Sequence, residues 1–173
     1  MMNSIDREFV ISVKGLSVGK HNYSFRIEKP FFDEYDNSQI INASLVANVS
    51  LLREISWIGL ESEIEGEVVV ECDRCLEEFS LPINTKASLI VKYEKRDNGF
   101  ESDEVLFLDP SESELNIKQF LYDYICLSLP LQRVHPEGKC NPEMIKILTK
   151  SLTSEKPEEL NTPLGSLKDL INN

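Results

Sequence analysis

The feature that most constrains the fold is a pair of long β-like runs separated by a short turn that carries two thiols. Residues 54–72 form the first run, residues 76–94 (LEEFSLPINTKASLIVKYE) form the second, and Cys72 and Cys75 lie between them as a Cys-x-x-Cys pair. Two runs joined by so short a connection are typical of an antiparallel hairpin. The sequence therefore predicts a long hairpin with the thiols at its tip, its first run being one strand or two joined by a bend near Gly66.

Three earlier segments show the period of two that is expected of strands with one buried face. Apolar residues alternate with polar ones at Phe9, Ile11 and Val13, at Tyr23, Phe25 and Ile27, and at Ile41, Ala43, Leu45, Ala47 and Val49. The GLSVG stretch between the first two segments predicts a turn, and residues 105–108 predict one more short strand. The first 109 residues are therefore expected to be β-rich.

The period then changes to that of a helix. In residues 116–130, NIKQFLYDYICLSLP, one helical face carries Ile117, Phe120, Leu121, Tyr124, Ile125 and Ser128. Asn116 is the expected cap and Pro130 the expected stop. A second helix is predicted to begin at Asn141-Pro142-Glu143, because a cap, a proline and an acid in that order are typical of a helix start.

These patterns predict an α+β protein in which an N-terminal antiparallel β-sheet is followed by C-terminal helices. One domain is expected over residues 1–152, β-rich over 1–109 and helical over 115–152, which is an ordinary size for a single domain. Residues 153–173 are expected to form a linker and a short C-terminal docking helix. The apolar residues of that helix would be Leu164, Leu167, Leu170 and Ile171.

The charge balance limits the partners. The chain has 30 acidic and 18 basic residues and a net charge of −12. Phosphate neutralisation needs clustered lysine and arginine, so a bare nucleic-acid surface is not predicted, and an acidic surface is better suited to a basic protein. No run approaches the roughly 20 apolar residues that cross a membrane. The N-terminus lacks the pattern of a secretory signal, so the chain is expected in the cytoplasm.

The Cys-x-x-Cys pair supplies half of a tetrahedral zinc site. His135 and Cys140, on the predicted loop between the two helices, are the candidates for the other half. A Cys₃His set of this kind would be closed to water and therefore structural. The alternative is that the thiols are reduced and metal-free, as is common in a reducing cytoplasm.

Two further thiol interpretations are less well supported. Cys126 is predicted to lie about 180° around the helix from Ile117, which indicates an incidental surface cysteine. A thioredoxin-like redox site needs a helix directly after the motif, but LEEFSLPI is strand-like, and Asp73 with its neighbouring glutamates disfavours a thiolate. The sequence shows no other catalytic constellation, so the protein is not expected to be an enzyme.

Several segments occur in an order that resembles the bacterial YceD family. They are KGLSVGKHNYSFRIEKPFF, VVVECDRCLEEFSLPI, the acidic stretch after it, NIKQFLYDYICLSLPLQRVHPEGKC and PLGSLKDL. The resemblance implies a cytoplasmic, non-enzymatic protein associated with the accumulation of large-subunit ribosomal RNA. The positions that match are Cys72, Arg74, Cys75, Pro130, His135 and Cys140, and Arg74 is carried over as a candidate binding residue. Many members have an Asp-Pro-Arg-like segment where this chain has Asn161-Thr-Pro-Leu164.

An acidic member of such a family is expected to act as an accessory factor in ribosome biogenesis. Its partner would be a basic ribosomal protein or an RNA-processing factor bound electrostatically, with direct RNA contact left open. Two alternatives stand beside this hypothesis: a zinc-stapled structural or adaptor module without a ribosomal role, and a Cys-x-x-Cys thiol-redox protein.

Overall fold

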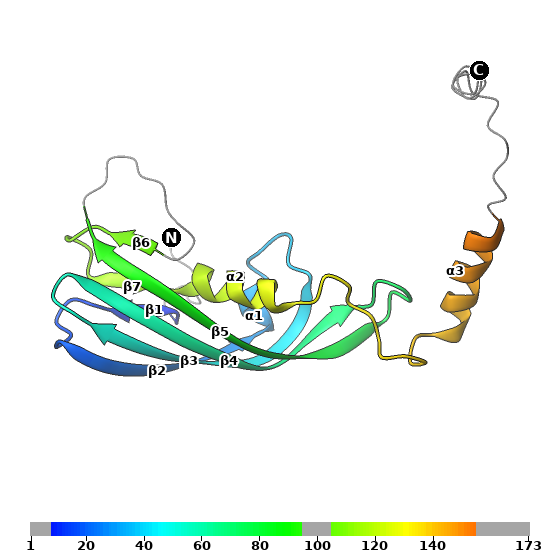
Figure 1. Cartoon of the computed structure of the whole chain (residues 1–173), viewed down its shortest axis with the longest axis horizontal. Helices are drawn as coiled ribbons and strands as arrows, with labels where there is room; N and C mark the ends of the chain where they lie inside the picture. Colours follow the sequence, from blue (N-terminus) through cyan, green and yellow to red (C-terminus); the bar gives the residue numbers. More distant parts are fainter. Residues whose placement is uncertain (1–7, 95–104, 155–173) are drawn as a thin grey trace, which may run out of the picture.

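The computed structural model describes residues 8–94 and 105–154, which form two sheets and three helices (Figure 1). The larger sheet has the strand order β2-β3-β4-β5-β6, and the smaller one pairs β1 with β7. The strands are β1 (Val10–Ser12), β2 (Gly19–Glu28), β3 (Ile40–Arg53), β4 (Trp57–Glu71), β5 (Glu78–Tyr93), β6 (Val105–Leu108) and β7 (Glu114–Asn116). The helices are α1 (Lys29–Phe32), α2 (Lys118–Ser128) and α3 (Pro142–Ser154). This arrangement confirms the predicted α+β class.

The predicted hairpin is present as β4 and β5. The two strands pair in antiparallel register over their whole length, from Trp57 opposite Lys92 to Glu71 opposite Glu78. β4 runs without interruption through Gly66, so the first of the two long runs is one strand. Its even-numbered residues from Ile58 to Val70, Gly66 excepted, are buried, and the odd-numbered ones point to the opposite face.

β3 follows the predicted alternation except at its start. Ile40 lies opposite Val70 and Asn42 opposite Val69, so the extra residue Ile41 forms a β-bulge. Ile40 is buried and Ile41 is only partly buried. The prediction that Ile41 continues the buried face is therefore wrong, because the bulge shifts the period by one residue.

Three features of the fold were not predicted. β6 pairs in parallel with β5, so the larger sheet is antiparallel except at this edge. β7 was not predicted at all; it pairs with β1 and thereby removes β1 from the larger sheet. The third feature is the short helix α1, which follows β2 directly. Periodicity shows which face of a segment is buried but not which strand that segment pairs with. The sequence therefore did not reveal the β5–β6 and β1–β7 pairings.

The core lies between the larger sheet and a layer made of α1, α2 and the β1–β7 pair, which lie on the same side of the sheet (Figure 1). From this layer, Phe31, Phe32, Leu121 and Ile125 are almost fully buried. The predicted apolar face of α2 is thus confirmed at its centre. The N-cap of α2 is Ile117, one residue after the predicted Asn116, although Asn116 Oδ1 accepts the Lys118 N–H at 2.8 Å and so satisfies a donor of the first turn.

Cys126 corrects another prediction. It is half-buried rather than exposed, and burial raises the pKa of its thiol. Tyr35, in the turn after α1, stacks on Tyr122 with ring centroids 3.6 Å apart, and Tyr122 hydrogen-bonds Cys126, so a second side of α2 is packed. A single helical period could not show that α2 has two packed sides.

The C-terminal part of the described chain is α3. The helix starts where predicted, because Asn141 Oδ1 accepts the Glu143 N–H at 2.9 Å and the Met144 N–H at 3.4 Å. It ends at Ser154, and the predicted docking helix lies outside the described residues. No described helix is both long enough and apolar enough to span a membrane.

Candidate metal centre

The hairpin tip folds into a tight knuckle that turns both thiols inward. The Cys72 N–H donates to the Glu77 carbonyl at 2.9 Å, and the Leu76 N–H donates to the Cys72 carbonyl at 2.9 Å. Leu76 has a φ of 61°, in the left-handed region that an L-residue enters only when its surroundings require it. Cys72 is 0% exposed and Cys75 is 2% exposed, so the knuckle buries its sulfur atoms at the end of the sheet.

The connection between α2 and α3 passes beside this tip (Figure 1), and Asp73 and Arg133 link the two. The Asp73 N–H donates to the Arg133 carbonyl at 2.8 Å, and Asp73 Oδ2 accepts the Arg133 N–H at 2.7 Å. The Arg133 guanidinium adds an ion pair at 3.0 Å. The Arg133 backbone N–H lowers the pKa of Asp73 most, and its guanidinium lowers it further.

A second link lies at the start of α3. Asn141 Nδ2 donates to Glu77 Oε1 at 2.7 Å, while Asn141 Oδ1 caps the helix. Neither this link nor the Asp73–Arg133 pair was predicted. The only sequence signal was a pair of opposite charges close to the candidate ligands, and such pairs are common on surfaces.

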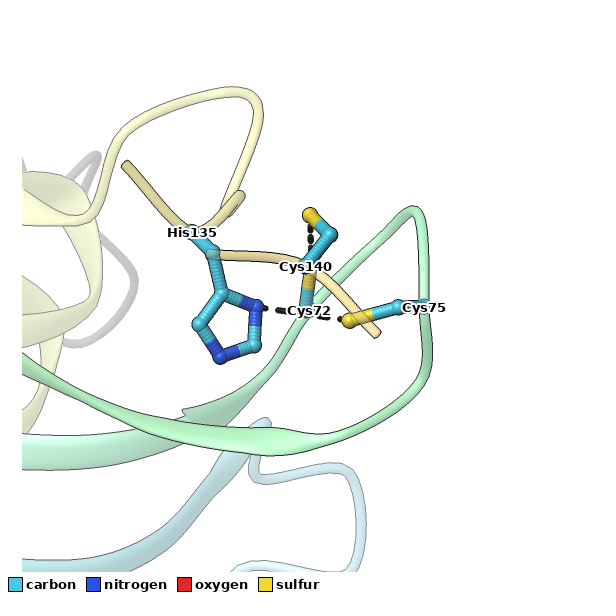
Figure 2. Close-up of side chains that lie close together, drawn as sticks. All are labelled: Cys72, Cys75, His135 and Cys140. Carbon is cyan, nitrogen blue, oxygen red and sulfur yellow. Dashed lines mark hydrogen bonds between the residues drawn. The ribbon is translucent and has the colours of Figure 1, made fainter. Parts of the chain in front are cut away.

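These contacts bring all four predicted ligands together. The Sγ atoms of Cys72, Cys75 and Cys140 and a ring nitrogen of His135 lie within 4.8 Å of one another. Cys75 Sγ is 3.3 Å from His135 Nδ1, and Cys72 Sγ is 3.9 Å from Cys140 Sγ (Figure 2). In a tetrahedral zinc site with bonds of about 2.0–2.3 Å, neighbouring ligand atoms are roughly 3.5–3.8 Å apart. The two separations of 3.3 and 3.9 Å lie close to this range, and the cluster is compact enough to hold a metal ion.

Phe79 fixes the orientation of His135. The two rings pack with their centroids 4.7 Å apart and their planes inclined by 36°. Phe79 is the second residue of β5, so the imidazole packs against the sheet next to the knuckle. A ligand whose ring is already oriented loses less conformational freedom when it binds a cation.

The knuckle also favours ionised sulfur. Burial on its own would raise the pKa of Cys72, but hydrogen bonds from the backbone of Cys75, Arg74 and His135 lower it from 9.0 to about 6. The pKa of Cys140 is raised, by burial and then by its neighbours Cys72 and Cys75. The thiolate is the form that binds metal, so the backbone of the tip and of the α2–α3 connection favours the metal-binding form of Cys72.

Arg74, the remaining candidate, contributes no ligand to this cluster. Its side chain is exposed, and Nη2 lies 3.5 Å from the His135 carbonyl, the limit of a hydrogen bond.

The residues that follow the Cys-x-x-Cys motif form β5 and not a helix. The helix N-terminus that lowers the nucleophile's pKa in thioredoxin-like sites is therefore absent here.

Comparison with known proteins places these features in a family. The model of the YceD family, described as large ribosomal RNA subunit accumulation protein, matches residues 60–171. Searches of the curated proteins and of the solved structures found no match to this chain. The matched range covers more than half of the chain, including most of β4, all of β5 and the four residues of the cluster. The chain therefore belongs to the YceD family.

Proposed function

We propose that this protein is a non-enzymatic accessory factor in ribosome biogenesis, acting in the cytoplasm to promote the accumulation or processing of large-subunit ribosomal RNA. The observation that carries the proposal is the match of the YceD family model over residues 60–171. The protein would act through contacts with a basic ribosomal protein or an RNA-processing factor. Its net charge of −12 supports a basic partner over bare RNA.

The surface best suited to such a partner is the outer face of the sheet. β4 carries a glutamate at four successive outward positions, and we call this set the glutamate face: Glu61, Glu63, Glu65 and Glu67. Glu63 pairs with Lys86 at 2.9 Å and Glu65 accepts a hydrogen bond from Asn84 at 3.4 Å. Exposed pairs of this kind are weak, so they offer little competition to an incoming cation.

The glutamate face also has a hollow that would admit a partner segment. A cavity of about 750 Å³ lies over the middle of strands β2 to β5, and its lining includes Ser24, Asn48, Glu61, Glu63 and Lys86. Outward side chains along a strand repeat about every 6.4–6.8 Å. A basic segment in extended conformation has the same repeat, so lysines or arginines at alternate positions would match successive glutamates.

The proposed role of the cysteine cluster is structural. Three thiolates and one imidazole are a donor set that suits Zn²⁺ and completes a tetrahedron without a position for water. Cys72 and Cys75 would hold the ion from the hairpin tip, and His135 and Cys140 would hold it from the α2–α3 connection. Zinc would thus staple the helical part of the chain to the end of the sheet.

The first test of the function is depletion of the protein. We expect the ratio of large-subunit to small-subunit ribosomal RNA to fall, or precursors of the large-subunit RNA to accumulate, and both to be restored by the wild-type chain. Quantitative RNA blotting with small-subunit RNA as the internal control measures this ratio. An unchanged ratio and unchanged precursors would contradict the proposed role and leave the family match as a likeness of fold.

The partner surface can be tested by neutralising it. Joint replacement Glu61→Gln, Glu63→Gln, Glu65→Gln and Glu67→Gln is expected to weaken binding to extracted large-subunit ribosomal proteins about tenfold at low salt, because it removes the opposed charges. The wild-type complex should weaken in the same way as salt is added. Salt-dependent pull-down with quantified bound protein measures both effects.

The control for this experiment removes the same charge elsewhere. Its substitutions are Glu8→Gln, Glu112→Gln, Glu114→Gln and Glu137→Gln, all at exposed positions away from the glutamate face. This control should bind like the wild type. If both quadruple variants lost binding equally, net charge and not the glutamate face would be responsible.

A further inference from the structure

The three thiols of the cluster differ in access and in neighbours. Cys72 and Cys75 are almost fully buried, whereas Cys140 is half-buried on the connection between α2 and α3. Cys140 Sγ lies 3.9 Å from Cys72 Sγ, and Cys75 Sγ, which also neighbours Cys140, lies 3.3 Å from His135 Nδ1 (Figure 2). A small oxidant arriving from solvent therefore meets Cys140 first, and Cys72 Sγ lies 3.9 Å from the sulfur that it meets.

We propose that Cys140 and Cys72 form an oxidant-sensitive pair, in which a hydroperoxide such as hydrogen peroxide converts the two thiolates into a disulfide and expels the metal. Release of the metal ion rests on the structural zinc site proposed above. Formation of the disulfide rests on the positions of the two sulfur atoms. The disulfide and the zinc release can therefore be contradicted independently.

The chemistry proceeds in two steps. The Cys140 thiolate attacks one peroxide oxygen, the O–O bond breaks, and Cys140 becomes a sulfenic acid while hydroxide leaves. The Cys72 thiolate then attacks the sulfenic sulfur, the S–O bond breaks, and a second hydroxide leaves as the S–S bond forms. The two sulfurs lose two electrons, the peroxide gains them, and two protons from solvent convert the hydroxides to water. Two of the four ligands are then gone, so Zn²⁺ is released.

The choice of Cys72 over Cys75 has a structural consequence. A bridge within the knuckle would leave the α2–α3 connection held to the tip by non-covalent contacts such as Asp73–Arg133 and Asn141–Glu77. A Cys72–Cys140 bridge joins residues 68 positions apart and keeps the connection at the tip. Oxidation would therefore replace a metal staple by a covalent one, freeing Cys75 and His135 while the overall closure is retained.

The experiment uses the full chain, purified without chelator and titrated with hydrogen peroxide. Zinc release is followed with a chromogenic zinc indicator, and linkages are mapped by mass spectrometry of non-reduced peptides. We expect Cys72–Cys140 to be the main linkage, with one zinc released per disulfide formed. Cys126→Ser, which changes a thiol outside the cluster, should behave like the wild type.

The linkage found in the wild-type chain decides the question. A main product that joins Cys72 to Cys75, or a Cys140 sulfinic acid without any bridge, would overturn the proposal. Cys140→Ser also removes a ligand, so the wild-type map and not this variant carries the test. Protein that holds no zinc as purified would contradict the staple, and mapping of the same oxidised but metal-free chain would still confirm or reject the Cys72–Cys140 pair.

Discussion

Cys72→Ser is expected to reduce the zinc content of the purified protein from about one ion per chain to less than about 0.2. A serine hydroxyl is neutral near pH 7 and is a poor substitute for a thiolate, and Cys72 lies fully buried at the centre of the knuckle. At a free zinc concentration a thousand times the Kd, bound metal stabilises the folded state by about 4 kcal/mol. The Cys72→Ser variant should lack this stabilisation by bound metal.

Elemental analysis and thermal unfolding, each with and without a chelator, measure this prediction. The matched control is Cys126→Ser, because Cys126 is half-buried on α2 and lies outside the cluster. The control should keep its zinc and its chelator-sensitive melting temperature. Wild-type protein with less than about 0.2 zinc per chain would contradict the Cys₃His site, since a closed site retains its metal through purification. Full zinc content in Cys72→Ser would remove Cys72 from the ligand set.

The candidate site could be predicted from sequence because its two halves are local. Cys72 and Cys75 are three residues apart, and His135 and Cys140 are five residues apart on one connection. Residue type and spacing were enough to suggest that these four belong together, and the structure brings them within 4.8 Å. The contacts that hold the two halves together, above all Asp73–Arg133, join surface residues that are 60 positions apart. Such contacts produce no periodic pattern in the sequence.

The fold was predictable to the same degree and for the same reason. The β4–β5 hairpin and both main helices follow from period, cap and turn, all of which are properties of neighbouring residues. The parallel pairing of β6, the β1–β7 pair and the second packed side of α2 depend on contacts between distant segments. Cys126 and Ile41 were misplaced because a packed turn and a bulge each altered a face that the local period alone had assigned.

Gly66→Ala is expected to destabilise the protein by about 3 kcal/mol or more. Gly66 lies in the middle of β4 with a φ of +140°, a conformation that residues with a Cβ rarely adopt. A Cβ at this position would lie 2.2 Å from the Ser44 carbonyl oxygen and 2.9 Å from Leu45 Cα. Both atoms belong to the backbone of β3, so relief of the collision requires that two long strands separate. Urea unfolding followed by circular dichroism measures the change in the free energy of unfolding.

Gly19→Ala separates the collision from the backbone strain. Gly19 has a similar φ of +130°, but nothing lies within 4 Å of the added Cβ, so its alanine variant carries the conformational cost alone, roughly 1–2 kcal/mol. The excess loss in Gly66→Ala then reports how closely β3 and β4 approach at this point. Equal losses in the two variants would mean that the strands can separate there without cost. A large excess would show that this close approach fixes the position of β4, which carries the glutamate face and leads to Cys72.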